Sequence, residues 1–215
     1  MSKLIVMTNQ LGNFMTNCYI VANQDIGECI IIDPPDNARF LCNEMESRQF
    51  RCVGIYITHG HIDHIGAVGG IKDILGHSIQ VHCSIQEAEL LENPRTNLSS
   101  MFGEIITIKP EVLLEDGQEM IVLDKKMKCI LVPGHTKGGM CYYFEEDHIL
   151  FSGDTLFAGE IGRCDFPTGN YETLVGSIRE KLLTLPEETI VYPGHDEKTT
   201  VKREKQFNPY CGEQA

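Results

Sequence analysis

The segment from residue 59 to residue 64 concentrates side chains that can bind metal. Three histidines and one aspartate occupy six positions directly after the apolar run 53–58, in the order His59, Gly60, His61, Ile62, Asp63, His64. Imidazole nitrogen and carboxylate oxygen are ligands that zinc and similar cations accept. His59 and His61 project to the same side of an extended chain, and the adjacent Asp63 and His64 suit a second centre. A solvated loop would rarely gather three of the chain's eight histidines here, so the segment predicts a metal site.

Three later residues share a setting that suits the same site. His135, Asp154 and His195 each follow a glycine, and each stands just past an apolar run that reads as a strand. Taken singly, each is typical of a turn. Together with the 59–64 cluster, which calls for further ligands, they are expected to face one crevice at the carboxyl ends of strands. The remaining histidines, at positions 77, 82 and 148, lack this setting and are interpreted as surface or strand residues.

Composition narrows the classes of function. The net charge of −13 over 215 residues makes nucleic acid an unfavourable partner. Nine cysteines, an odd number with no CxxC spacing, argue against a disulfide framework or a zinc ribbon. No apolar run approaches the ~20 residues of a membrane span, and the short apolar start at residues 4–7 is unlike a signal peptide. We therefore expect a cytoplasmic protein with reduced thiols and no membrane partner.

Hydrophobic patterns indicate the elements that must position these residues. Near-continuous apolar runs predict strands buried on both faces, and amphipathic stretches predict helices. Strands are expected at 4–7, 18–22, 29–32, 53–58, 79–82, 105–108, 120–123, 128–132, 140–144, 148–152 and 189–192, and helices at 36–48, 66–75, 84–92, 171–185 and from 199. Each half of the chain has clustered strands followed by a helix. The pattern predicts two packed sheets with helices outside.

These motifs closely resemble those of the metallo-β-lactamase superfamily. The matching segments are Thr58 to His64, Pro133-Gly134-His135-Thr136, Ser152 to Phe157, Pro193-Gly194-His195, Asn17-Cys18-Tyr19 and Ile31-Ile32-Asp33. The resemblance runs from about residue 4 to 210. It implies an α+β fold, a four-layer αββα sandwich of two mixed sheets flanked by helices. It also implies one domain over 1–215, without the C-terminal helical domain that completes the glutathione site of glyoxalase II enzymes.

The resemblance assigns roles by position. His59, His61 and His135 would hold a first metal, Asp63, His64 and His195 a second, and Asp154 would bridge the two. The set is similar to the glyoxalase II branch, because class B1 enzymes have Cys where this chain has Asp154. It implies two divalent ions, with zinc expected first and iron or manganese as alternatives. A hydroxide shared by the metals would attack a carbonyl, and the catalytic carboxylates Asp63 and Asp154 would help to neutralise the metal charge.

Substrate is less constrained. A basic residue binds glutathione nine positions after the bridging aspartate in glyoxalase II enzymes, and Arg163 occupies that position here. Arg163 could hold a substrate carboxylate or pair with Asp165. The leading hypothesis is a hydrolase of small thioesters such as hydroxyacylglutathione, acting as a monomer or small homo-oligomer. The alternatives are a mononuclear iron persulfide dioxygenase, a lactonase or β-lactamase on the same site, and a metal-binding protein without turnover.

Overall fold

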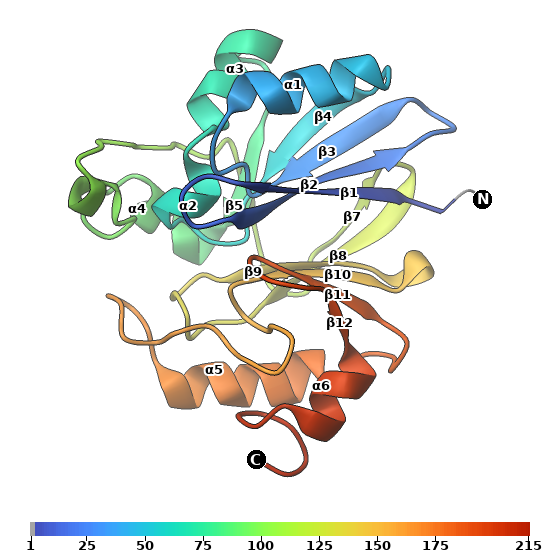
Figure 1. Ribbon diagram of the computed structural model, residues 1–215, viewed down its shortest axis with the longest axis vertical. Helices are drawn as coiled ribbons and strands as arrows, with labels where there is room; N and C mark the ends of the chain where they lie inside the picture. The colour runs from blue at the N-terminus through green and yellow to red at the C-terminus, as the bar shows by residue number, and fades with distance from the viewer. Residues whose placement is uncertain (1–2) are drawn as a thin grey trace.

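The computed structural model describes residues 3–215 and consists of two six-stranded β-sheets packed face to face, with helices on both outer faces (Figure 1). Both sheets combine parallel and antiparallel pairs. The α+β class and the four-layer αββα sandwich expected from the sequence are thereby confirmed.

The first sheet contains the N-terminal strands in their sequence order. These are β1 (Ile5–Leu11), β2 (Thr16–Asn23), β3 (Glu28–Ile32), β4 (Arg51–Tyr56), β5 (Val81–Ser84) and β6 (Val112–Leu114). β1, β2 and β3 are antiparallel, whereas β3 to β6 are parallel. Because β3 and β4 run the same way, the residues that follow them, Asp33 and Thr58 to His64, emerge at one edge of the sheet.

The second sheet contains the C-terminal strands. In spatial order they are β12 (Thr199–Thr200), β11 (Ile190–Pro193), β10 (Ile149–Gly153), β9 (Met140–Phe144), β8 (Lys125–Leu131) and β7 (Glu119–Val122). β10 and β11 are parallel, and β8 runs in the same direction as β10 because both are antiparallel to β9. The three strands that precede His135, Asp154 and His195 therefore end at the same edge.

Central strands are buried on both faces, as their apolar runs predict. All eight residues of β2 are buried. Cys18 and Ile20 pack toward the helices outside the first sheet, whereas Tyr19 and Val21 pack between the sheets. Two backbone hydrogen bonds join the sheets beside the predicted site, from Met140 N to the Thr58 carbonyl (2.8 Å) and from Asn17 N to the carbonyl of Gly194 (2.7 Å). The loops that carry the candidate ligands thus belong to one rigid edge.

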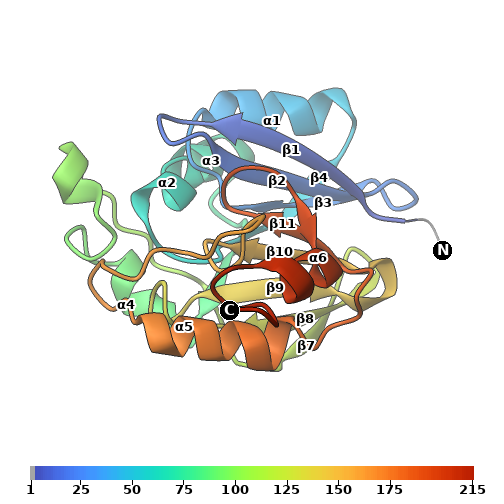
Figure 2. The same ribbon diagram turned by 60° about the horizontal axis from the view of Figure 1, so that its bottom comes forward.

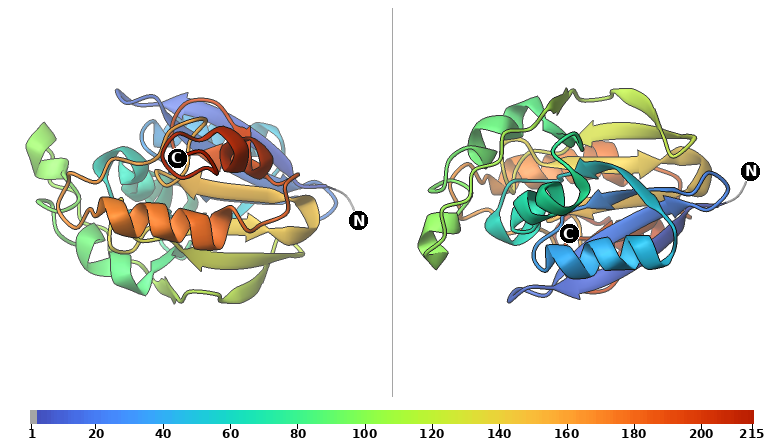
Figure 3. Two further views of the ribbon diagram at one scale, coloured as in Figure 1. Left: turned by 90° about the horizontal axis from the view of Figure 1, so that it is seen from below. Right: turned by 90° about the horizontal axis from the view of Figure 1, so that it is seen from above.

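Helices complete the outer layers. α1 (Ala38–Ser47) and α3 (Val68–Leu75) cover the first sheet, as the view from above shows (Figure 3). α5 (Tyr171–Ser177), which continues as a π-helix over Ile178–Leu182, and α6 (Val201–Phe207) cover the second sheet (Figure 2). The connections contain the helices α2 (Ile62–Ile65) and α4 (Ala88–Leu91) and the 3₁₀ turns Ile85–Glu87, Ser99–Phe102 and Glu145–Asp147. Among residues 3–215, no helix is long and apolar enough to cross a membrane.

The expected strand at 105–108 is wrong. Ile105 is 77% exposed. The backbone of this stretch bonds to neighbouring turns and not to a strand: Ile108 N donates to the Leu91 carbonyl (3.0 Å) and Ile106 N to the Ser99 hydroxyl (3.2 Å). The sixth strand is β6, a few residues further on. Short apolar runs do not reveal whether a neighbouring strand is available to pair with them.

Candidate metal centre

All seven candidate ligands gather at the edge where the strands end. The β4 end leads into His59 and His61, and the short helix α2 then turns Asp63 and His64 inward. His135, Asp154 and His195 arrive from the ends of β8, β10 and β11. Gly194 allows this approach, because a Cβ there would lie 2.1 Å from Asp154 Oδ1.

The first donor set consists of three histidines. His135 Nε2 lies 3.2 Å from His59 Nε2 and 3.0 Å from His61 Nδ1. Ligand atoms about 2.0–2.1 Å from a tetrahedral ion stand about 3.3 Å from one another. The spacing of the three nitrogens therefore matches the ligand shell of one metal ion.

The second donor set adjoins the first. Asp63 Oδ2 lies 3.6 Å from His64 Nε2 and 3.3 Å from His195 Nε2. Asp154 stands between the sets, with Oδ1 3.3 Å from His64 Nε2 and Oδ2 3.5 Å from His195 Nε2 and 3.8 Å from His135 Nε2. One carboxylate thus contacts donors of both sets, which is the arrangement that a bridging ligand requires.

Buried atoms without partners support the fit to metal. His64 Nε2 and Asp154 Oδ1 are buried and face each other at 3.3 Å, and neither makes a hydrogen bond to another group among residues 3–215. Leaving such groups unsatisfied is costly, so an ion between them accounts for their placement. Imidazole and carboxylate together suit a borderline divalent cation.

Electrostatics differ between the two sets. Burial lowers the pKa of His59 and His135, and it lowers the pKa of His61 to about 3, so these imidazoles are neutral and ready to coordinate. In the second set, burial also opposes protonation, but Asp154 and Asp63 raise the pKa of His64 above its usual range and that of His195 to about 9. Metal binding at the second set must therefore displace protons.

The two aspartates remain ionised beside these histidines. Burial alone would raise the pKa of Asp154, but His64 and His195 hold it well below the usual range. The pKa of Asp63 is likewise lowered, since its attraction to His64 and its hydrogen bond with His195 outweigh burial. Both carboxylates are therefore charged and available as ligands.

Outer contacts orient the ligands. Asp33, which is 2% exposed, lies 3.0 Å from His64 Nδ1 and accepts hydrogen bonds from the Thr58 amide (2.7 Å) and hydroxyl (2.5 Å). His135 Nδ1 contacts the Arg163 carbonyl at 2.7 Å. Such partners fix which ring nitrogen faces the metal. The role of Asp33 was missed from the sequence, although the segment Ile31-Ile32-Asp33 was among those that resemble the family.

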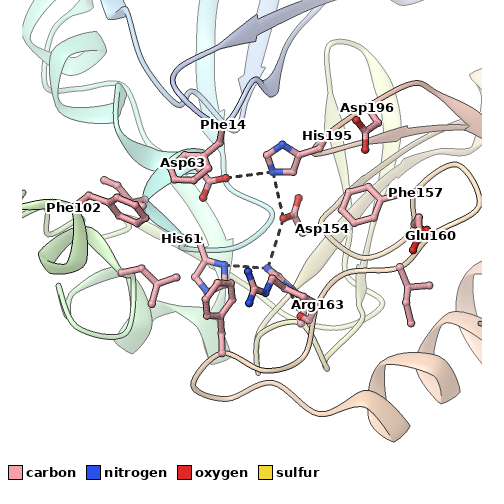
Figure 4. Close-up of a pocket in the computed structure, with 15 residues that line it drawn as sticks. Phe14, His61, Asp63, Phe102, Asp154, Phe157, Glu160, Arg163, His195 and Asp196 are labelled. Carbon is pink, nitrogen blue, oxygen red and sulfur yellow. Dashed lines mark hydrogen bonds and ion pairs between the residues drawn. The ribbon is translucent and has the colours of Figure 1, made fainter.

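A cavity of about 490 Å³ opens over the two donor sets (Figure 4). His61, Asp63, Asp154 and His195 face it. Its wall is largely apolar and includes Phe14, Leu98, Phe102, Phe157, Ile161 and Phe166. A small molecule could thus reach the donors in a mostly apolar setting.

Arg163 lies on the wall of this cavity but already has a partner. Its guanidinium makes two hydrogen bonds to Asp165, of 2.7 and 2.6 Å, and stacks over Phe166 with 4.1 Å to the ring centroid. The ion pair was one of the two roles expected for Arg163. Because Arg163 also lines the cavity, the other expected role, contact with the substrate, stays a proposal.

The fold and site define a metal-binding αββα sandwich protein. The sequence model described as the metallo-beta-lactamase superfamily matches residues 11–195, and the chain belongs to that superfamily as a metallo-hydrolase. It is similar to the hydroxyacylglutathione hydrolase GloC of Haemophilus influenzae, with 34% identity over 92% of this chain and 93% of the relative.

Two solved structures share the whole architecture. The BLEG-1 B3 metallo-beta-lactamase is 36% identical, with a TM-score of 0.90 over 96% of this chain and 99% of its own. TTHA1623, solved in a di-iron-bound form, is 31% identical, with a TM-score of 0.82 over 95% and 100% of the two chains. The di-iron form of TTHA1623 shows that a relative with this architecture holds iron.

Proposed function

We propose that this protein is a two-metal hydrolase that cleaves small thioesters such as hydroxyacylglutathione. The observation that carries the proposal is the junction of two donor sets at Asp154, whose two oxygens lie 3.3–3.8 Å from donors of both. Asp63, His64 and His195 supply donors for a second ion beside the three histidines, and metal analysis tests whether that ion is bound. The similarity to GloC supports the thioester class.

The reaction depends on how the residues hold charge. Two divalent ions, when bound, supply a hydroxide nucleophile near neutral pH and polarise the carbonyl under attack. Asp154 brings the two donor sets together, and Asp63, 18% exposed at its side chain, offsets positive charge beside the cavity. The largely apolar wall offers few polar groups near the donors, so electrostatic interactions with a bound carbonyl would be stronger than in open water.

The cavity supports a small-molecule substrate. Phe14 and Phe102 meet edge to face, with ring centroids 5.2 Å apart, and offer an apolar surface. Arg163 provides a positive charge on the wall of the cavity. We propose that its guanidinium contacts an anionic group on the thiol portion of the thioester while it keeps a hydrogen bond to Asp165. The net charge of −13 remains unfavourable for nucleic acid.

Zinc is the metal that we propose first, because mixed imidazole and carboxylate sites accept it readily. The di-iron relative makes iron the principal alternative. Metal analysis of the purified protein distinguishes them, and it does so independently of substrate.

The decisive test is hydrolysis of S-lactoylglutathione by protein loaded with two equivalents of Zn²⁺, with oxygen uptake recorded in parallel. The proposal expects thiol release without oxygen consumption. Oxygen uptake with a persulfide substrate and one iron per chain would instead indicate a dioxygenase. Because BLEG-1 is a B3 metallo-beta-lactamase, a cephalosporin belongs in the panel, and hydrolysis of it alone would reject the thioester class.

A further inference from the structure

Glu87 is a buried acid that the metal chemistry does not use directly. It ends the 3₁₀ turn that follows β5, its side chain is fully buried, and no basic side chain forms an ion pair with it among residues 3–215. Burial raises its pKa above the usual value, and hydrogen bonds from Gly60, Thr136 and Gly138 offset this rise only in part. Burying a carboxyl group is costly unless hydrogen bonds or a positive charge compensate for the lost water.

The three hydrogen bonds of Glu87 reach both loops that supply the first donor set. Oε1 accepts from Gly60 N at 2.9 Å, and Oε2 accepts from the Thr136 hydroxyl at 3.0 Å and from Gly138 N at 2.9 Å. Gly60 lies between His59 and His61, and Thr136 directly follows His135. One side chain therefore joins the backbone around all three histidines.

The two glycines permit this close approach. A Cβ on Gly138 would lie 2.5 Å from Glu87 Oε2 and 2.4 Å from Glu87 N, and a Cβ on Gly60 would lie 2.6 Å from the Leu90 side chain. Ser84 adds a hydrogen bond from its hydroxyl to the Gly138 carbonyl, at 2.5 Å. The turn after β5 thus fits closely against both ligand loops.

Charge gives the contact a further meaning. The first donor set consists of three neutral imidazoles and shares Asp154 with the second, which has Asp63 of its own and Asp33 behind His64. Glu87 is a further buried carboxyl group, and its hydrogen bonds place it on the side of the first set. It can favour a cation there both by position and by charge.

We propose that Glu87 is the positioning residue of the first metal site. Its carboxylate holds the His59–His61 loop against the His135 loop, at the spacing that one ion requires, and it raises the metal affinity of this site selectively. The inference rests on the two-metal site proposed above.

The test is a Zn²⁺ titration of metal-free protein against a competing chelator, for wild type and Glu87→Gln. Glutamine has nearly the same shape but carries no charge and cannot accept from Gly60, Thr136 and Gly138 at once. We expect about a tenfold loss of affinity, the lower end of the effect of removing a direct partner of a metal ligand, because Glu87 contacts the loops and not the imidazoles. The matched control is Glu89→Gln, two residues on, because Glu89 is 83% exposed and pairs only with Lys137 among residues 3–215. It should bind Zn²⁺ like wild type.

Double variants assign the loss to one site. His195→Ala weakens the second site and His61→Ala the first, so Glu87→Gln should lower affinity on the His195→Ala background and leave the His61→Ala background unchanged. The visible spectrum of bound Co²⁺ should change only where the first site is retained. Equal loss on both backgrounds, or no loss on either, would overturn the proposal.

A second variant guards against misfolding. Thr136→Val keeps the shape of the side chain and removes one of the three hydrogen bonds, so it should cause a smaller loss at the same site. If Glu87→Gln does not fold, unchanged affinity in Thr136→Val rejects the role of Glu87. Failure of wild type to bind two Zn²⁺ ions would instead reject the proposed function, so the two failures are distinguishable.

Discussion

Replacing Asp33 by asparagine should weaken the second metal site without disturbing the fold. Asp33 has a backbone φ of +50°, which asparagine tolerates better than most residues. The side chains are nearly equal in size, so the buried surroundings can remain. What changes is the group that faces His64 Nδ1 at 3.0 Å.

The expected magnitude follows from the tautomer of His64. The Asp33 carboxylate keeps the proton on Nδ1 and leaves Nε2 free, 3.3 Å from Asp154 and 3.6 Å from Asp63. An amide NH₂ facing Nδ1 favours the opposite tautomer, whose Nε2–H cannot coordinate. Losing an outer partner of this kind costs about 10–100-fold in metal affinity, or about 1.4–2.8 kcal/mol.

The assay combines a competitive Zn²⁺ titration with nitrogen NMR of the His64 ring. Asp25→Asn, in the exposed turn before β3, is the matched control. We expect one of the two binding steps to weaken in Asp33→Asn, and in the metal-free protein, at a pH above the raised pKa of His64, the single ring proton should lie on Nε2. Wild-type affinity for both ions, or an unchanged tautomer, would refute the argument.

Three further predictions follow from named contacts. His61→Ala should lose the first metal and more than about 100-fold of the activity, beyond the range for an outer partner, with circular dichroism unchanged; full activity without metal would contradict the mechanism. Arg163→Ala should raise KM for anionic thioesters, because roughly 1–3 kcal/mol of charge-assisted binding free energy is lost. Asp165→Asn should lower KM, because it frees the guanidinium. An unchanged KM in both variants would leave Arg163 a structural residue. Burial lowers the pKa of His82 to about 4, so the unfolded chain takes up this proton first on acidification, and stability present above pH 6.5 is lost toward pH 4. Between pH 7 and pH 5 the free energy of unfolding should fall by about 2 kcal/mol through this group. Denaturant unfolding of the metal-free protein should therefore depend less steeply on pH in His82→Gln than in wild type. An equal pH dependence in the two proteins would contradict the prediction.

Much of the architecture could be predicted because its signals are local. Apolar runs such as 18–22 and 140–144 mark strands buried on both faces, and the structure places each inside its sheet with a neighbouring strand on either side. The cluster at 59–64 indicates a metal site because its ligands are close in sequence. The shared setting of residues 135, 154 and 195, each after a glycine and past an apolar run, indicated the remaining partners, and the family resemblance assigned their roles. The structure brings all of them to one edge.

Features that depend on distant contacts could not be predicted. The hydrogen bond from Gly60 to Glu87 joins residues 27 apart, and the contact of Asp33 with His64 joins residues 31 apart. Neither acid belongs to a spacing that suggests its partner. The short helix α2 was also missed, because its four residues are too few to show helical periodicity.

Metal stoichiometry followed together with thioester hydrolysis tests the central claim most directly. Metal-free protein is titrated with Zn²⁺ while release of thiol from S-lactoylglutathione is measured at each step. We predict that bound zinc reaches two ions per chain and that activity is complete only when both sites are filled. Saturation at one ion with full activity, or hydrolysis that persists without metal, would contradict the two-metal mechanism.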